Sequence, residues 1–143
     1  MITLQIKGEK EVSQKLQRLA RGTWPALTVA LDLEAKKILQ TSQTKYVPVV
    51  EGDLRDSGYV KPSTHSHNTV RVNVGYSSPY AKVTHENPRA GKTSGRDPSG
   101  RSYKQWSTVG SWKFLEHPMN RAALGMARRL GKIINLSWSR LVK

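Results

Sequence analysis

The alternation of apolar and polar residues changes its period early in the chain. Residues 2–6 alternate one by one, which predicts a short strand that ends at Gly8. Apolar residues from Val12 to Leu19 then recur at the i, i+4, i+7 spacing of one helix face. Gly22 is placed to end this first helix, because glycine is common just past a helix C-terminus.

A second helical pattern begins directly afterwards. Thr23 suits the N-cap, and Pro25 falls in the first turn, where its missing N–H costs nothing. An apolar stripe then runs from Leu27 to Ile38, with lysines on other faces. Pro48 lies at or shortly beyond the predicted end of this helix, because proline cannot continue it.

The middle of the chain has the pattern of strands. A loop over 49–58 leads into a strand near Tyr59, and a polar, turn-rich segment covers 62–68. Over 70–76 apolar residues alternate with polar ones, which is typical of a strand with one buried face. The two strands predict a β-hairpin. The pattern over 80–86 fits either a third strand or a helical turn.

Residues 87–110 follow neither period. Glycine, proline, serine and threonine are frequent, so a long loop is expected in place of a packed element. Five cationic side chains stand against one Asp, which gives the segment a net charge of +4. A loop of this length inside a small domain is usually functional or disordered. The side chains expected to meet DNA or a neighbouring subunit are Arg89, Lys92, Arg96, Arg101, Lys104 and Trp106.

Helical periodicity returns in the last quarter of the chain. Pro118 suits a helix start, and apolar residues from Met119 onward predict one long amphipathic helix. On another face of this helix lies a basic stripe made of Arg121, Arg128 and Lys132. Two glycines inside the predicted helix each cost about 1 kcal/mol relative to alanine, for which close packing against a neighbour is one rationale.

Together these elements predict a single α+β domain over residues 1–143. A small antiparallel sheet is expected to pack against two N-terminal helices and a long C-terminal helix. The 87–110 segment extends from this body as a long basic loop.

The overall charge adds a strongly cationic surface to this picture. The chain carries 24 Lys and Arg against 10 Asp and Glu, a formal charge of +14. Such a charge attracts polyanions, of which nucleic acid is the obvious one, and it equally serves solubility or an acidic protein partner. Because only 36% of the residues are hydrophobic, the core of a single copy is modest and oligomerisation is a reasonable expectation.

Composition also removes several kinds of chemistry. The absence of cysteine excludes disulfides, thiol nucleophiles and cysteine-ligated zinc. No apolar run approaches the roughly 20 residues that span a bilayer, and the N-terminus lacks the pattern of a signal peptide. A soluble product that is not exported is therefore expected. A membrane-surface role for the C-terminal helix remains a minor alternative.

Three patterns suggest catalytic or ligand sites, and each has an ordinary explanation. Gly91-Lys92-Thr93 resembles the end of a phosphate-binding loop, but the position that needs the earlier glycine is Glu86. His65 and His67 lack a third metal ligand nearby in sequence. A nuclease centre in a basic protein needs converging carboxylates. The candidates for it are Glu51, Asp53, Asp56, His85 and Glu86. Acidic residues in turns more often bond their own backbone, so no enzyme, metal or cofactor is expected.

The order of several short motifs resembles a known family. Val47-Pro48-Val49 precedes Gly52-Asp53-Leu54-Arg55-Asp56-Ser57, and Tyr80-Ala81-Lys82-Val83-Thr84-His85-Glu86 follows further on. After the variable loop comes Trp112-Lys113-Phe114-Leu115-Glu116-His117-Pro118. This order resembles that of small bacteriophage neck and tail-completion proteins, which join head to tail as minor tail components. The family often has glutamate-x-glycine-threonine where this chain has Glu86-Asn87-Pro88, and its loop is less basic.

The resemblance implies a structural virion protein of the phage neck. Such proteins form rings, commonly of six copies, between the head connector or stopper and the tail tube or tail terminator, and DNA crosses the lumen. It also implies assembly in the host cytoplasm and non-catalytic roles for the motif residues. Gly52 would allow a turn with positive φ, Leu54 would start a strand with its side chain in the core, and Tyr80 would cover a sheet edge. The full set of motif residues is Pro48, Gly52, Leu54, Ser57, Tyr80, Ala81, Glu86, Phe114, Leu115 and Pro118.

A second interpretation of the same charge needs no ring. A small basic module that binds nucleic acid on its own would also use the cations of the 87–110 loop. It predicts salt-sensitive DNA binding by a monomer or dimer, whereas the neck interpretation predicts a ring that forms alone or on its connector or tail tube.

Overall fold

A computed structural model describes residues 9–49, 51–66, 69–91, 94–96, 99–103, 107 and 109–141. The predicted strand over 2–6 lies outside these residues. The elements, in chain order, are α1 (Glu9–Thr41), the π-helical turn η1 (Ser42–Tyr46), α2 (Asp53–Asp56), β1 (Gly58–Ser66), β2 (Thr69–Tyr76), α3 (Ala81–Glu86), β3 (Gly95–Arg96), β4 (Ser102–Tyr103), α4 (Glu116–Ala123) and α5 (Met126–Leu141).

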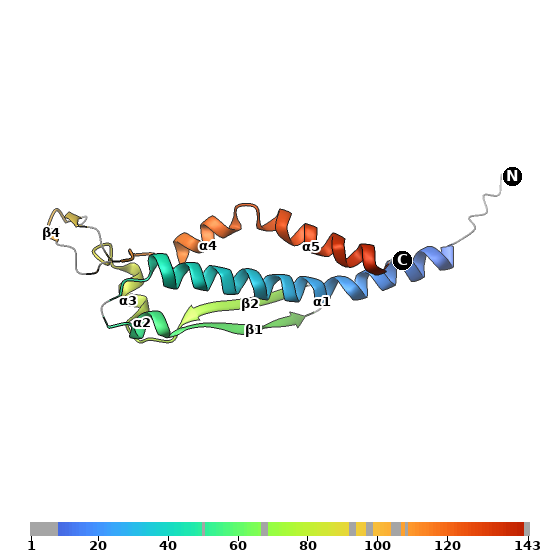
Figure 1. The fold of residues 1–143 in the computed structure, drawn as a ribbon, viewed down its shortest axis with the longest axis horizontal. Helices are drawn as coiled ribbons and strands as arrows, with labels where there is room; N and C mark the ends of the chain where they lie inside the picture. Colours follow the sequence, from blue (N-terminus) through green and yellow to red (C-terminus); the bar gives the residue numbers. More distant parts are fainter. Residues whose placement is uncertain are drawn as a thin grey trace.

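The long helix α1 forms the axis of the molecule (Figure 1). The β1–β2 hairpin packs along one side of it, and α4 and α5 lie along another. With 33 residues, α1 is about 50 Å long, and its first turns extend beyond the end of α5 (Figure 1). The α+β class is confirmed, with a hairpin and two C-terminal helices attached to one helix.

The prediction of two N-terminal helices is wrong, because α1 runs without interruption through Gly22, Thr23 and Pro25. Thr23 is not an N-cap: its hydroxyl donates to the carbonyl of Leu19 one turn earlier, at 2.7 Å. Pro25 lies inside the helix and removes one backbone hydrogen bond. Since Pro25 lies on an exposed face, water is available to the carbonyl that loses its partner.

The predicted hairpin is confirmed. β1 and β2 pair antiparallel, with Gly58 opposite Tyr76 and Ser66 opposite Thr69. The register shifts between Lys61 and Thr64, around Pro62, which has no N–H to donate to a ladder. β1 thus continues through most of the segment that was predicted as a turn. Along β2 the valines are half-buried while the residues between them are exposed.

The single C-terminal helix predicted from the apolar pattern is also wrong. Helix α4 ends at Ala123, and Leu124 adopts an extended conformation (ψ 112°). Gly125 follows with φ +80°, in the left-handed region that glycine tolerates best. It therefore separates α4 from α5 and does not sit inside a helix. Pro118 lies in the first turn of α4, as expected.

Two further expectations about local structure are resolved. The segment over 80–86, for which a strand and a helical turn were both open, forms the helix α3 and not a strand. Leu54 does not start a strand either: it lies in the single turn α2 and is half-buried. Within the 87–110 segment, the described residues include a two-residue ladder between β3 and β4.

The described core is small. Apart from proline, the apolar side chains that are buried among the described residues are Ala30, Ala35, Ile38, Val47, Ala90 and Phe114. Three of the six are alanines, so the described part of the chain encloses little apolar volume. Larger apolar side chains, including Val12 and Leu16, remain exposed. The face predicted from Val12 to Leu19 is therefore helical, but its first two members do not pack within the chain.

Candidate functional site

The motif residues gather where α1 ends. Phe114 is almost fully buried and meets the rings of Tyr76 and His85 edge to face, with centroids 5.2 and 5.0 Å away. The Tyr76 hydroxyl donates to Ser42 Oγ at 2.7 Å, and Ser42 Oγ donates to the carbonyl of Phe114 at 2.7 Å. This relay ties β2, η1 and the segment before α4 into one cluster. Burial raises the pKa of Tyr76 to about 12.

A shallow hollow of about 200 Å³ adjoins this cluster. Its walls include the motif residues Ala81, Phe114 and Leu115, together with Tyr76, Lys82 and His85. Its lining is mainly apolar, and His85 is engaged with Glu86, so the hollow offers no nucleophile paired with a base. Tyr80, expected to cover a sheet edge, is instead 72% exposed beside it.

Glu86 belongs to a surface network of charges. Its carboxylate lies 2.9 Å from Nδ1 of His85 and 3.0 Å from Nζ of Lys113, and Lys113 also contacts Glu116 at 2.8 Å. Hydrogen bonding to His85, followed by Lys113, lowers the pKa of Glu86, and Glu116 and Glu86 raise the pKa of Lys113. The backbone N–H of Lys113 also donates to the carbonyl of His85. These contacts hold α3 against the start of α4, which is a structural role.

The glycine motif makes a tight turn before β1. Gly52 has φ +101°, so the expected left-handed turn is confirmed. The backbone N–H groups of Asp56 and Ser57 donate to the carbonyls of Gly52 and Asp53, and the Ser57 hydroxyl donates to the carbonyl of Leu54. Ser57 also accepts from the N–H of Ser77, which joins the turn to the end of β2.

Only part of the 87–110 segment belongs to the described residues. Arg96 and Arg101 are exposed, Arg89 is half-buried, and Lys92, Lys104 and Trp106 lie outside the described residues. The first described residues of this segment pack against the body of the protein. Ala90 is buried, and Gly91 forms a bridge with Ser111. The grouping of the six side chains into one site therefore stays a prediction.

Two apolar surfaces were not anticipated. The first is the projecting end of α1, where Val12 and Leu16 are 57% and 61% exposed. By helical spacing they share a face with Thr23, which accepts a hydrogen bond from Trp138 Nε1 of α5 at 2.6 Å. The face that α5 covers thus continues along α1 beyond the point where α5 ends. The apolar spacing predicted a buried face, and only the position of α5 reveals the exposure.

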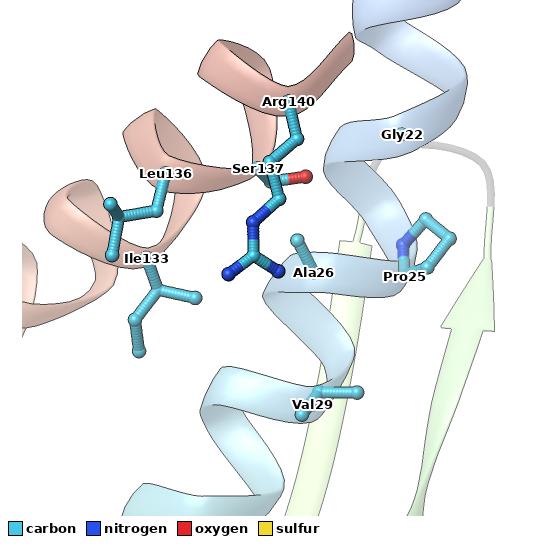
Figure 2. A pocket seen from close by; sticks show the side chains of 8 residues that line it. All are labelled: Gly22, Pro25, Ala26, Val29, Ile133, Leu136, Ser137 and Arg140. Atoms are coloured by element: carbon cyan, nitrogen blue, oxygen red, sulfur yellow. The ribbon is translucent and has the colours of Figure 1, made fainter.

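The second surface is an open groove of about 630 Å³ between α1 and α5. Figure 2 shows its two walls, one from each helix. Its lining residues are Gly22, Pro25, Ala26, Val29, Ile133, Leu136, Ser137 and Arg140. Val29 and Leu136 are about 60% exposed (58% and 61%), so the groove presents apolar side chains that nothing in the described chain covers.

The C-terminal helices present a cationic surface. Every charged residue after Glu116 in the sequence is Lys or Arg. Arg128 and Lys132 of the predicted basic stripe are exposed on α5, and no ion pair involving them occurs among the described residues. Arg121 of the same stripe lies on α4 and donates to the Tyr46 hydroxyl at 3.3 Å. The charged residues of α5 are therefore all cations.

The acidic residues considered for a nuclease do not form a cation site. In the described part of the chain, no three His, Asp or Glu side chains lie close enough together to hold a metal ion. Asp56 pairs with Arg55, and Glu86 with His85 and Lys113. His65 lies in β1, and His67 lies outside the described residues.

Among the described residues, burial shifts the pKa of Tyr76, and hydrogen bonds within ion pairs shift the pKa values of Glu34, Glu86, Lys113 and Arg129. None of the described helices is both long enough and apolar enough to cross a lipid bilayer. The candidate site thus consists of two apolar surfaces and one cationic surface, together with the small cluster of motif residues.

Comparison of the chain with models of protein families, with curated protein sequences and with solved structures finds no match.

Proposed function

We propose that this chain is a structural, non-enzymatic component of a bacteriophage neck, which completes the tail and joins it to the head connector as a ring. The motif order in the sequence suggests this role. In the structure Phe114 packs in the core, Gly52 forms a turn and Glu86 forms ion pairs, which are roles that a structural protein uses.

The observation that carries the proposal is the unsatisfied apolar end of α1. Val12 and Leu16 extend a face that α5 covers further along, and a second exposed apolar surface lies in the α1–α5 groove. A small core with apolar surface left open at two different places is expected of a subunit that neighbours complete. A ring needs non-identical contact surfaces on each copy, because its contacts run head to tail, and we assign the end of α1 to one side of that contact.

The cationic surface supports a position around DNA. Counterion release favours a polyanion near Arg128 and Lys132, and Arg96 and Arg101, in and beside the β3–β4 ladder, add further exposed charge. We propose that the 87–110 segment is a long basic loop that reaches DNA or a neighbouring subunit.

The test is to delete the protein from the phage that encodes it. We expect electron microscopy of the resulting particles to show filled heads and separate tails, and mass spectrometry of wild-type virions to detect the chain. Infectious particles that lack the protein would overturn the proposal.

A paired variant addresses the ring itself. We expect Val12→Ser combined with Leu16→Ser to leave the helical content unchanged, because both side chains are exposed, and to prevent ring formation on the connector or tail tube. Met119→Ser with Leu124→Ser removes similarly exposed apolar groups from α4 and the break after it, and should leave the ring intact. Equal assembly by both pairs would show that the end of α1 is not a ring contact.

A second candidate is a stand-alone nucleic-acid-binding protein, favoured by the single sign of charge after Glu116. It predicts tight binding of DNA by a monomer or dimer and no copies in the virion.

A further inference from the structure

The α1 wall of the groove belongs to a longer stripe along the helix. Gly22, Pro25 and Val29 line the groove, and Arg18, Leu33 and Lys36 continue the same spacing of three and four residues. Its apolar part, from Gly22 to Leu33, spans about 16 Å, or three helical turns. Arg18 and Lys36 are exposed and bound this apolar part at its two ends.

The opposite wall has the same character. Ile133 and Leu136 face the groove from α5, and the guanidinium of Arg140 reaches toward it (Figure 2). The groove therefore has apolar walls with Arg140 as its charged lining residue, and Arg18 and Lys36 lie at the two ends of the α1 stripe. Among the described residues that line the groove, Arg140 is the charged one, and no carboxylate lies on its walls.

We propose that this groove binds an amphipathic helix with acidic flanks, contributed by a different protein of the particle. The proposal rests on the neck role for the identity of the neighbour. An amphipathic helix laid in an apolar groove is a common mode of peptide recognition. The small residues Gly22 and Ala26 let a partner backbone approach α1, and a helix of about twelve residues matches the length of the apolar part.

Charge favours a partner other than a second copy of this chain. The exposed apolar end of α1, with Val12 and Leu16, is the obvious self-partner, but the first turns of α1 carry both signs of charge, because Glu9 and Glu11 stand among its lysines and arginine. Docked into the groove, this segment would bring cations as well as carboxylates toward Arg140. Helix α5 carries cations alone. An acidic helix instead satisfies both the apolar walls and the charged margins.

A flat anionic membrane also attracts cations and apolar side chains, but it does not fill a groove between two helices. The concave shape of the site therefore favours a helix, and lipid binding becomes an outcome of the test.

The experiment uses the full-length protein and two synthetic helical peptides of about twelve residues. Both have the same leucine stripe, and one has glutamate flanks while the other has lysine flanks. We expect fluorescence anisotropy to show binding of the glutamate peptide at least about tenfold tighter than that of the lysine peptide. Val29→Ser with Leu136→Ser should weaken it by about tenfold or more, because two apolar contacts are lost.

Val83→Ser with Leu124→Ser is the matched control, since these side chains are 71% and 77% exposed elsewhere. We expect it to bind the glutamate peptide as the wild type does. Arg18→Gln with Arg140→Gln should reduce the preference for glutamate over lysine flanks.

Several results would overturn the proposal. These are no binding of the glutamate peptide, no preference between the peptides, or equal loss in the groove and control variants. A change of oligomeric mass in the groove variant would identify a second copy as the occupant. Loss of binding to phosphatidylserine vesicles without loss of peptide binding would identify a membrane. The neck role is judged separately, by virion content, so it stands or fails independently.

Discussion

Arg129 and Glu34 form a bidentate ion pair across 95 residues of sequence, with Nε to Oε1 at 3.0 Å and Nη2 to Oε2 at 2.7 Å. Glu34 is only 4% exposed, and Arg129 covers it from α5. The same guanidinium donates to the carbonyls of Ala122 and Leu124. One side chain therefore joins α5 to α1 and also satisfies backbone groups at the end of α4.

We expect Arg129→Met to destabilise the fold by about 3 kcal/mol, because it leaves the Glu34 carboxylate buried without its main partner. Chemical denaturation measures this change. Arg128→Met, at the exposed neighbouring position, should cost less than about 0.5 kcal/mol. If both substitutions lowered the free energy of unfolding equally, the Arg129–Glu34 ion pair would contribute no more to stability than an exposed arginine does.

The same pair predicts a dependence on acid. Hydrogen bonding from Arg129 lowers the pKa of Glu34 below its ordinary value, despite the opposing effect of burial. A lowered pKa in the folded state gives a contribution to stability that is present above the unfolded pKa, about 4.3, and is lost as pH falls through the folded pKa. Thermal unfolding from about pH 6 downward should show this loss, and Glu34→Gln should show a shallower decline.

The raised pKa of Tyr76 predicts that the stability of the fold also falls at alkaline pH. Burial raises its pKa to about 12, whereas an unfolded tyrosine ionises near pH 10. The neutral hydroxyl therefore contributes stability below pH 10, and this contribution is lost as pH rises through 12.

We expect Tyr76→Phe to cost about 1 kcal/mol near neutral pH, because the hydrogen bond to Ser42 is lost. Above about pH 10 the variant should lose less stability than the wild type, so that the difference between them narrows. Urea unfolding at neutral and alkaline pH tests this. Parallel curves for the two proteins would contradict the assignment of this ionisation to Tyr76.

The close packing around Gly110, the last residue of the 87–110 segment, predicts a steric effect of substitution there. Its φ is +91°, and an added Cβ would lie 2.4 Å from the backbone nitrogen of Pro48. Gly110→Ala should therefore destabilise the fold by about 3 kcal/mol or more, through both strain and overlap. Gly100 also has positive φ (+82°) but has open space around it, so Gly100→Ala should cost only about 1 kcal/mol. Similar unfolding midpoints for the two variants would place Gly110 outside any packed contact.

Local patterns predicted the hairpin and most helical residues, and they were misleading at helix boundaries. Gly22, Thr23 and Pro25 together have the signature of a helix end followed by a new start. The helix continues because the hairpin and α5 pack along both sides of α1, and this packing outweighs a local cost of a few kcal/mol. At Gly125 the error was the reverse. An apolar period continued across the glycine, and the preference of glycine for left-handed backbone after a helix was the signal that identifies the break.

The surfaces of the site were harder to predict than the elements. The motif residues Phe114, Pro118 and Pro48 were expected to have structural roles, and all three are buried. The α1–α5 groove and the Arg129–Glu34 pair depend on how distant segments meet, and no sequence spacing encodes that. The exposure of Val12 depends in the same way on where α5 ends.

The cationic face of α5 gives a last prediction, which concerns DNA. Arg128 and Lys132 lie one turn apart on its exposed side, and Asn135 and Ser139 continue the stripe without a carboxylate. If both cations contact phosphates, Arg128→Gln with Lys132→Gln should reduce the slope of log K against log salt by about two for duplex DNA. Lys15→Gln with Arg18→Gln removes the same charge from α1, where Glu9 and Glu11 lie nearby, and should change the slope by less than half as much. Filter binding over a range of salt concentrations measures both slopes. Equal changes would mean that DNA responds to the net charge of the chain and not to this face.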